Sequence, residues 1–143
     1  MSTLSAAMAA SGSALTAERV RLEASVSNLA NAESTRGPDG LPYRRRSVVL
    51  APTDVSSFDA ALGRASGAIG VKVNDIVEDQ TPFKRRYEPG HPDADKDGFV
   101  QLPNVDSAEE MVDMLSAARA YQANLSAIGL IRDLVQRSLE LGR

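Results

Sequence analysis

The sequence predicts an α+β protein in which long N- and C-terminal helices pack as a coiled-coil-like pair around a small central β domain. Three observations support this: an apolar repeat near each end of the chain, and short runs of β-branched residues between them. We therefore expect one helix within residues 1–34, a loop and small β-rich domain over 35–104, and a second helix within 105–143.

The C-terminal repeat is the stronger of the two. Between Asp106 and Leu141, apolar and small residues recur at alternating steps of three and four, the spacing of a coiled-coil seam, and only Arg132 interrupts it. The members are Met111, Met114, Ala118, Tyr121, Leu125, Ile128, Val135 and Leu139. At about 1.5 Å per residue this helix would be roughly 50 Å long, whereas a compact chain of this length is about 35–40 Å across. We expect it to project from the body or to lie against other chains.

The N-terminal repeat contains fewer large residues. Its members are Met8, Leu15, Leu22 and Leu29, spaced by sevens, with Leu4 and Val26 at intermediate steps. Such a stripe buries too little apolar surface to hold a helix by itself, so the C-terminal helix is its expected partner. Two arrangements stay open: a closed hairpin within one chain, or helices whose small-residue surfaces let several neighbours approach closely.

Composition limits the size of the central body and the chemistry it can support. Of the 143 residues, 43% are apolar but only 4% are aromatic, and the chain has no Trp and no Cys. The formal net charge of −3 gives no general attraction for nucleic acid. No apolar run approaches the roughly 20 residues of a membrane span. Because no Lys or Arg precedes Arg19 and no dense apolar stretch is present, a cleaved signal peptide is not expected.

The central region predicts four short strands. The turn-rich segment Thr35–Pro42 ends the first helix, and runs rich in β-branched or aromatic residues follow it. The expected strands are Tyr43–Leu50, Val71–Val77, Phe83–Tyr87 and Phe99–Leu102, the last two forming a hairpin. The segment Asp54–Gly70 is expected to be a loop or a short helix.

The two ends of the last helix carry their own signals. Asp106 and Glu109 form a D-x-x-E arrangement, which predicts an N-cap and a reciprocal contact from Glu109 to the Asp106 backbone. Arg137 and Arg143 are expected to complement the helix dipole at the other end.

An acidic turn raises the question of a metal site. Asp93, Asp95, Asp97 and Gly98 match the first half of an EF-hand calcium loop. Position twelve is Asn104 instead of the bidentate Glu that completes such a loop. We therefore expect a solvated Asp-Gly turn and assign no metal.

Two basic clusters, Arg44–Arg46 and Lys84–Arg86, lie beside aromatic residues on which nucleic-acid bases could stack. Because strand side chains alternate, each cluster divides between two faces, and no RNA-binding signature surrounds either one. These arginines are expected to be solvated or to pair with acidic surfaces of neighbouring subunits. Nucleic acid is not an expected partner.

Catalysis finds no support in the sequence. His91, the only histidine, lies in a Pro-Gly-Pro loop without a nearby nucleophile. No Gly-rich phosphate loop and no metal-ligand spacing occurs elsewhere. We expect no catalytic residue, no cofactor and no enzymatic activity.

The helix end Asn28–Thr35 and several later blocks form a set of specific motifs. The helix end contains the pattern Asn-x-Ala-Asn, with Leu29 where Ile is common. The later blocks are Asp79–Asp95, Gly98–Val105, Glu110–Met114 and Arg119–Asn124. Together these motifs resemble the rod and hook axial protein family of the bacterial flagellum, and within it the proteins of the proximal rod. The resemblance covers nearly the whole chain, with Gln122 and Gly129 as departures from the family pattern.

The resemblance implies a structural subunit of the proximal rod of the flagellar basal body. Terminal helices of such subunits polymerise into a hollow drive shaft, which lies in the periplasm. Implied partners are other copies of the chain, other flagellar rod proteins and the flagellar type III export apparatus, through which the chain would leave without a cleaved signal peptide. The alternative is a cytoplasmic helical adaptor or chaperone that binds client segments.

The expected assembly interface follows from the two repeats and the helix end. Its residues are Met8, Leu15, Leu22, Leu29, Asn28, Asn31, Met111, Met114, Tyr121, Leu125, Ile128 and Val135. Asn28 and Asn31, with Thr35, are expected to fix where the first helix ends. Whether the two asparagines only terminate the helix or also contact another subunit stays open at this stage.

Overall fold

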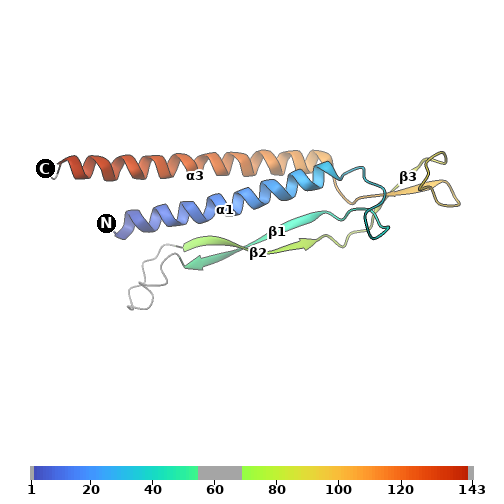
Figure 1. The fold of residues 1–143 in the computed structure, drawn as a ribbon, viewed down its shortest axis with the longest axis horizontal. Helices are drawn as coiled ribbons and strands as arrows, with labels where there is room; N and C mark the ends of the chain where they lie inside the picture. The colour runs from blue at the N-terminus through green and yellow to red at the C-terminus, as the bar shows by residue number, and fades with distance from the viewer. Residues whose placement is uncertain (1, 55–68, 142–143) are drawn as a thin grey trace.

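The computed structural model describes residues 2–54 and 69–141 and confirms the predicted α+β class (Figure 1). Its elements in chain order are α1 (Ser2–Ala30), β1 (Arg46–Asp54), β2 (Ile69–Glu78), β3 (Lys84–Tyr87), β4 (Phe99–Leu102) and α3 (Ser107–Leu141). The loop or short helix expected over Asp54–Gly70 lies outside the described residues, except at its two ends, which are strand.

The elements form an elongated arrangement in which α1 lies between α3 and the β1–β2 ribbon (Figure 1). α1 and α3 run antiparallel, so both chain ends lie at one end of the molecule. The β3–β4 hairpin lies at the opposite end, beyond the start of α3. The N-terminal helix thus packs against the C-terminal helix of its own chain, which is the hairpin, one of the two arrangements that the sequence left open.

Small side chains let α1 pack on two sides. Ala17 is 1% exposed and Ser25 is also buried. Ser13 faces the ribbon, where its Oγ accepts a hydrogen bond from the backbone N–H of Val71 at 3.1 Å. Because Ala and Ser side chains are small, both α3 and the β1–β2 ribbon can approach the backbone of α1 closely.

α1 ends at Ala30, before the predicted limit at residue 34, and continues as a hydrogen-bonded turn. The Ser27 carbonyl accepts the side-chain amide of Asn31 at 2.8 Å and also its backbone N–H at 3.1 Å, so Asn31 bonds twice to the last helical turn. Thr35 Oγ1 donates to Asp93 Oδ2 at 2.8 Å and so ties this end of the helix to the β3–β4 turn.

The strands form two separate antiparallel ribbons instead of one sheet. β1 pairs with β2, with a register shift between Val49 and Leu50. β1 begins at Arg46, three residues later than predicted, because the Arg45 N–H donates to Asn104 Oδ1 at 2.9 Å and not to a ladder partner. In a two-stranded ribbon each strand keeps an open edge, and this tolerates Pro52 within β1.

The predicted β3–β4 hairpin is confirmed. Gly98, just before β4, has a φ of +80°, and a Cβ at this position would lie 2.9 Å from Cε2 of Tyr87. Tyr87 and Phe99 stack edge to face with ring centroids 5.2 Å apart. Glycine is therefore required here both by backbone conformation and by the packed tyrosine ring.

The start of α3 confirms the predicted N-cap. Asp106 Oδ1 accepts hydrogen bonds from the N–H groups of Ala108 at 2.9 Å and Glu109 at 3.3 Å. The predicted reciprocal contact from Glu109 to the Asp106 backbone is wrong, because the described residues show no such hydrogen bond. The neighbouring Glu110 is the residue whose side chain is buried. At the other end of α3, Arg137 lies just before the last turn, which itself holds no basic residue. Arg143 lies outside the described residues, so the expected effect of these arginines on the helix dipole stays a prediction.

Candidate assembly site

Asn28 joins α1, β1 and α3 at the end of the helix pair where α1 ends and α3 begins. It is 1% exposed and uses all of its side-chain hydrogen-bonding capacity. Its Nδ2 donates to the Arg46 carbonyl at 2.9 Å and to Glu110 Oε2 at 3.0 Å. Its Oδ1 accepts from the Arg46 N–H and from the Tyr43 hydroxyl, both at 2.9 Å. The asparagine therefore fixes α1 to β1 and to α3 within one subunit.

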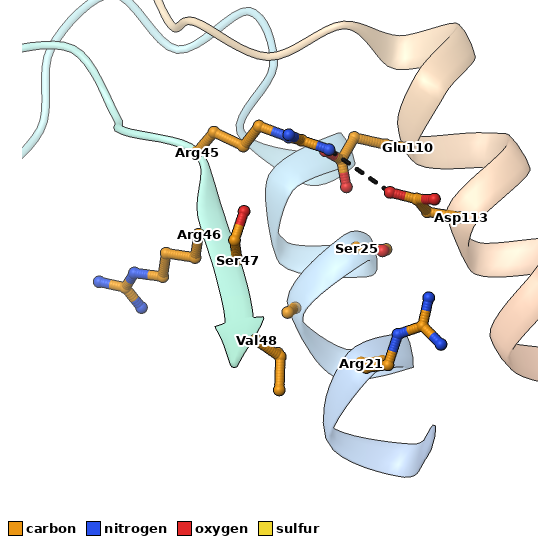
Figure 2. Close-up of a pocket in the computed structure, with 9 residues that line it drawn as sticks. Arg21, Ser25, Arg45, Arg46, Ser47, Val48, Glu110 and Asp113 are labelled. Carbon is orange, nitrogen blue, oxygen red and sulfur yellow. Dashed lines mark hydrogen bonds and ion pairs between the residues drawn. The ribbon is translucent and has the colours of Figure 1, made fainter. Parts of the chain in front are cut away.

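Glu110 supplies a buried charge at this junction. Its side chain is 1% exposed and accepts a hydrogen bond from Arg45 Nε. Arg45 also reaches Asp113, with Nη2 at 3.4 Å from Oδ2 (Figure 2). The bond to Glu110 raises the pKa of the Arg45 guanidinium above its ordinary value. A buried carboxylate needs a partner of this kind, because an unpaired one would carry a large desolvation penalty.

This ion pair corrects the sequence expectation for Arg45, which pairs within its own chain and not with solvent or a neighbouring subunit. Arg45 and Arg46 point to opposite sides of β1 (Figure 2), so the first cluster does divide between two faces. Arg46 lies over the Tyr43 ring at 5.6 Å, and Arg44 lies over the Phe83 ring at 4.4 Å.

The second basic cluster is also engaged within the chain. Lys84 Nζ donates to the Val105 carbonyl at 2.7 Å, and Arg86 lies 2.8 Å from Glu88. Arg85 stacks on Phe99 and donates to Asp95 at 3.1 Å. These contacts hold the β3–β4 hairpin to its own turn and to the start of α3.

The acidic turn has a structural role. Asp95 Oδ1 accepts hydrogen bonds from the N–H groups of Phe99 at 2.8 Å and Asp97 at 2.9 Å, and the bond from Phe99 is the main cause that lowers the pKa of Asp95. Asp93 is held by Thr35 and lies 3.4 Å from Arg36. Within residues 2–54 and 69–141, no group of three or more acidic or histidine side chains is placed to hold a metal ion.

The covered stripe of α3 differs from the predicted seam at every second position. Its residues recur at alternating steps of four and three: Glu110, Met114, Ala117, Tyr121, Asn124, Ile128, Ile131 and Val135. The prediction shares Met114, Tyr121, Ile128 and Val135, all at least half-buried. The prediction missed Glu110 and Asn124 because they are polar. It missed Ile131 because the predicted repeat placed Arg132 at this step.

The remaining predicted α3 residues lie on exposed faces. Met111 is 52% exposed and Leu125 is 46% exposed, and with Leu115 they form a band along one flank of the covered stripe. A second band on the other flank consists of Val112, Leu130, Leu134 and Leu141, each at least 57% exposed. Apolar surface of this extent typically marks a site of interaction with another molecule.

The predicted assembly residues of α1 fall into two groups, those with hydrogen bonds inside the subunit and those on the opposite side of the helix. Asn28 is buried inside the subunit, as described above, and Asn31 bonds to its own helix. Met8, Leu15, Leu22 and Leu29 lie on roughly the opposite side of α1 from buried Ala17; Met8 is 37% exposed and the other three are half-buried. Among the described helices, none combines the length and the apolar character needed to cross a membrane.

A long antiparallel helix pair with apolar bands on its outer sides defines a structural protein built to pack against other subunits. Residues 96–141 match a family model described as the C-terminal part of the flagellar basal body rod FlgEFG proteins. The chain is 48% identical to flagellar basal-body rod protein FlgC of Escherichia coli O6:H1 and to that of Salmonella typhimurium, over 92% of each chain. It is 42% identical to the FlgC of Bacillus subtilis, over 93% of this chain and 94% of that one. The chain belongs to the FlgC family of flagellar basal-body rod proteins.

Proposed function

We propose that this chain is a subunit of the proximal rod of the bacterial flagellar basal body, polymerising through the outer faces of its terminal helices into the hollow drive shaft. The observation that carries this proposal is the pair of apolar bands on α3, which nothing in the described part of the chain covers. Residues 1–34 and 105–143 act as assembly helices, and residues 35–104 form a small body attached to them.

The energetics favour assembly over a solitary subunit. Leu130 and Leu134 are 66% and 57% exposed, yet fully burying a leucine contributes about 1.5–3 kcal/mol. Several such residues along one helix give enough free energy to offset the entropy of association. The predicted site residues Met111 and Leu125 belong to this outer surface, whereas Met114 and Ile128 support it by holding α3 against α1.

The proposed partners and location rest on the names of the relatives. The partners are other copies of the chain, other flagellar rod proteins and the flagellar type III export apparatus. We propose that export through this apparatus takes place without a cleaved signal peptide. The subunit then lies in the periplasmic part of the basal body and acts as a structural protein, not as an enzyme. The adaptor alternative has no support among the relatives.

Complementation tests the proposal. A flagellated bacterium lacking its own FlgC would receive this chain, and swimming, secretion and purified basal bodies would be examined. We expect the chain to be exported by the flagellar route and to be present in purified rods. Retention of the chain in the cytoplasm, with no copy in basal bodies, would contradict the proposal and favour an adaptor.

A further inference from the structure

The two apolar bands of α3 lie on opposite sides of the helix pair. The first band is Met111, Leu115 and Leu125, and the second band is Val112, Leu130, Leu134 and Leu141. Asp113 lies on the same flank of the covered stripe as the second band, and it pairs with Arg45 of β1. The second band therefore lies on the ribbon side of α3, and the first band lies on the side away from the ribbon.

The outer face of α1 extends the first band. Ser13 marks the ribbon side of α1, because its Oγ accepts the N–H of Val71 in β2. Met8 and Val26 lie on the opposite side of this helix and are 37% and 52% exposed. On the side away from the ribbon, the exposed apolar surface therefore belongs to both helices.

The first band leaves room for large side chains of a partner. Ala118 and Gly129 continue it, at steps of three and four from Leu115 and Leu125. A Cβ at Gly129 would meet no atom within 4 Å, so nothing in the described part of the subunit requires glycine there. Because glycine weakens a helix interior relative to alanine, its presence at this open position favours close approach by another chain.

The charges at the outer edges of the two bands are opposite in sign. Asp133 and Glu140 lie at the outer edge of the first band, whereas Arg119 and Arg137 lie at that of the second. All four are exposed, and none of them makes an ion pair with another described residue. Arg132 is also on the first-band side, but next to the covered stripe. Contact between identical bands would bring like charges together, whereas contact between different bands pairs carboxylates with guanidinium groups.

We propose that the first band and the adjoining face of α1 receive the second band of a second copy of this chain. This contact joins two different surfaces on opposite sides of the subunit. Each subunit can therefore make it twice, and it can repeat from copy to copy as an open helical assembly requires. The inference rests on the proposed assembly function and specifies which two surfaces meet.

Site-specific photo-cross-linking tests this contact without an assumption about its register along the helices. A benzophenone amino acid would replace Leu115 in the strain lacking FlgC, and purified basal bodies would be irradiated. We expect a cross-linked dimer of this chain, with the adduct mapped by mass spectrometry to Val112, Leu130, Leu134 or a residue between them on the same flank. The same amino acid at exposed Lys96, in the turn of the distant hairpin, is the matched control and should give no adduct to the second band.

The outcomes separate this inference from the proposed function. An adduct on the first band of the other copy would overturn the contact between different bands. A Leu115 variant that is present in rods, but gives no more dimer than the Lys96 control, would overturn it as well and leave the rod function standing. Absence of the unsubstituted chain from rods would instead contradict the rod function itself.

A charge exchange provides an independent measurement. Asp133→Arg with Glu140→Arg places cations at both edges and should lower the amount of subunit in rods about fivefold. Adding Arg119→Asp and Arg137→Asp exchanges the two edges completely and should restore incorporation, while Asp97→Arg, in the distant turn, should have little effect. Urea unfolding of the isolated chains checks that any loss does not come from folding. Failure of the complete exchange to restore incorporation would count against this pairing.

Discussion

Asn28 and Glu110, 82 residues apart in sequence, share a buried hydrogen bond of 3.0 Å between Asn28 Nδ2 and Glu110 Oε2. The bond links the last full turn of α1 to the first turn of α3 and is supported by Arg45, which neutralises the carboxylate. Elsewhere α1 presents mostly small side chains to its neighbours, and these specify relative position poorly. A single buried polar contact can fix such a register, as it does in coiled coils.

Asn28→Leu should strongly destabilise the subunit. The substitution keeps approximate size but removes the hydrogen bonds of Asn28 to Glu110 Oε2 and to the backbone groups of Arg46, which should cost about 3 kcal/mol in the free energy of unfolding. Urea denaturation would measure it. Asn124→Leu is the matched control, because the amide of Asn124 bonds only to the Ala120 carbonyl of its own helix, and its loss should cost less than about 1 kcal/mol. Equal losses of stability in the two variants would show that the hydrogen bonds of Asn28 contribute no more than the single bond of Asn124.

Acid should weaken the folded state in part through Asp106. The N–H groups of Glu109 and Ala108 lower the pKa of this carboxyl in the folded protein relative to the unfolded chain. A lowered folded pKa gives a contribution that is present above the unfolded value of about 3.9 and is lost as pH falls through the lower folded value.

Asp106→Asn isolates this contribution, because Asn also caps helices but does not titrate. Between pH 5 and pH 2.5, the thermal unfolding temperature of the variant should fall by less than that of the original chain. Identical pH profiles for the variant and the original chain would show that the N-cap does not contribute to acid sensitivity.

Leu134→Asp should block rod assembly without harming the isolated subunit. Leu134 is 57% exposed, so a carboxylate there meets water in the free chain and changes its stability by no more than about 0.5 kcal/mol. Buried against a neighbouring subunit, the same carboxylate would be costly. Cells should be non-motile while the variant is still exported. Gln136→Asp, at an exposed polar position, should leave swimming intact, and full motility of the Leu134→Asp strain would exclude this face from the interface.

Gly98→Ala should destabilise the β3–β4 hairpin by about 2 kcal/mol, because it combines an unfavourable backbone conformation with a clash. The added methyl would meet the Tyr87 ring at 2.9 Å and Cβ of Pro89 at 3.2 Å. The loss of dispersed amide signals from the hairpin in NMR spectra would report it. Gly90→Ala meets no atom within 4 Å and should behave like the original chain.

Calcium should leave the thermal unfolding temperature unchanged. Both carboxylate oxygens of Asp95 are already used, Oδ1 by two backbone N–H groups and Oδ2 by Arg85. The bidentate twelfth ligand of a calcium loop is replaced by Asn104, whose amide bonds to Asp79 and Thr81. A shift of several degrees at millimolar calcium, absent in an Asp95→Asn variant, would restore the metal hypothesis.

The sequence alone determined the element types, the β3–β4 hairpin and the N-cap at Asp106. These features depend on local signals: helical and strand periodicity, the Asp97-Gly98 turn and an N-capping carboxylate. The motifs around Asn28 and after Asp79 were specific enough to indicate the family. All of these properties are carried by residues close together in the chain.

Tertiary structure decided which side of each helix faces inward. An apolar repeat through Met114, Tyr121 and Ile128 can be completed on either side, and packing against α1 selects Ala117 and Ile131 over Ala118 and Arg132. The contact between Asn28 and Glu110 could not be predicted from the sequence either, because a pattern of apolar residues does not indicate which carboxylate is buried. Only the approach of α1, β1 and α3 places Arg45 where it compensates that charge, and this depends on contacts between residues far apart in the chain.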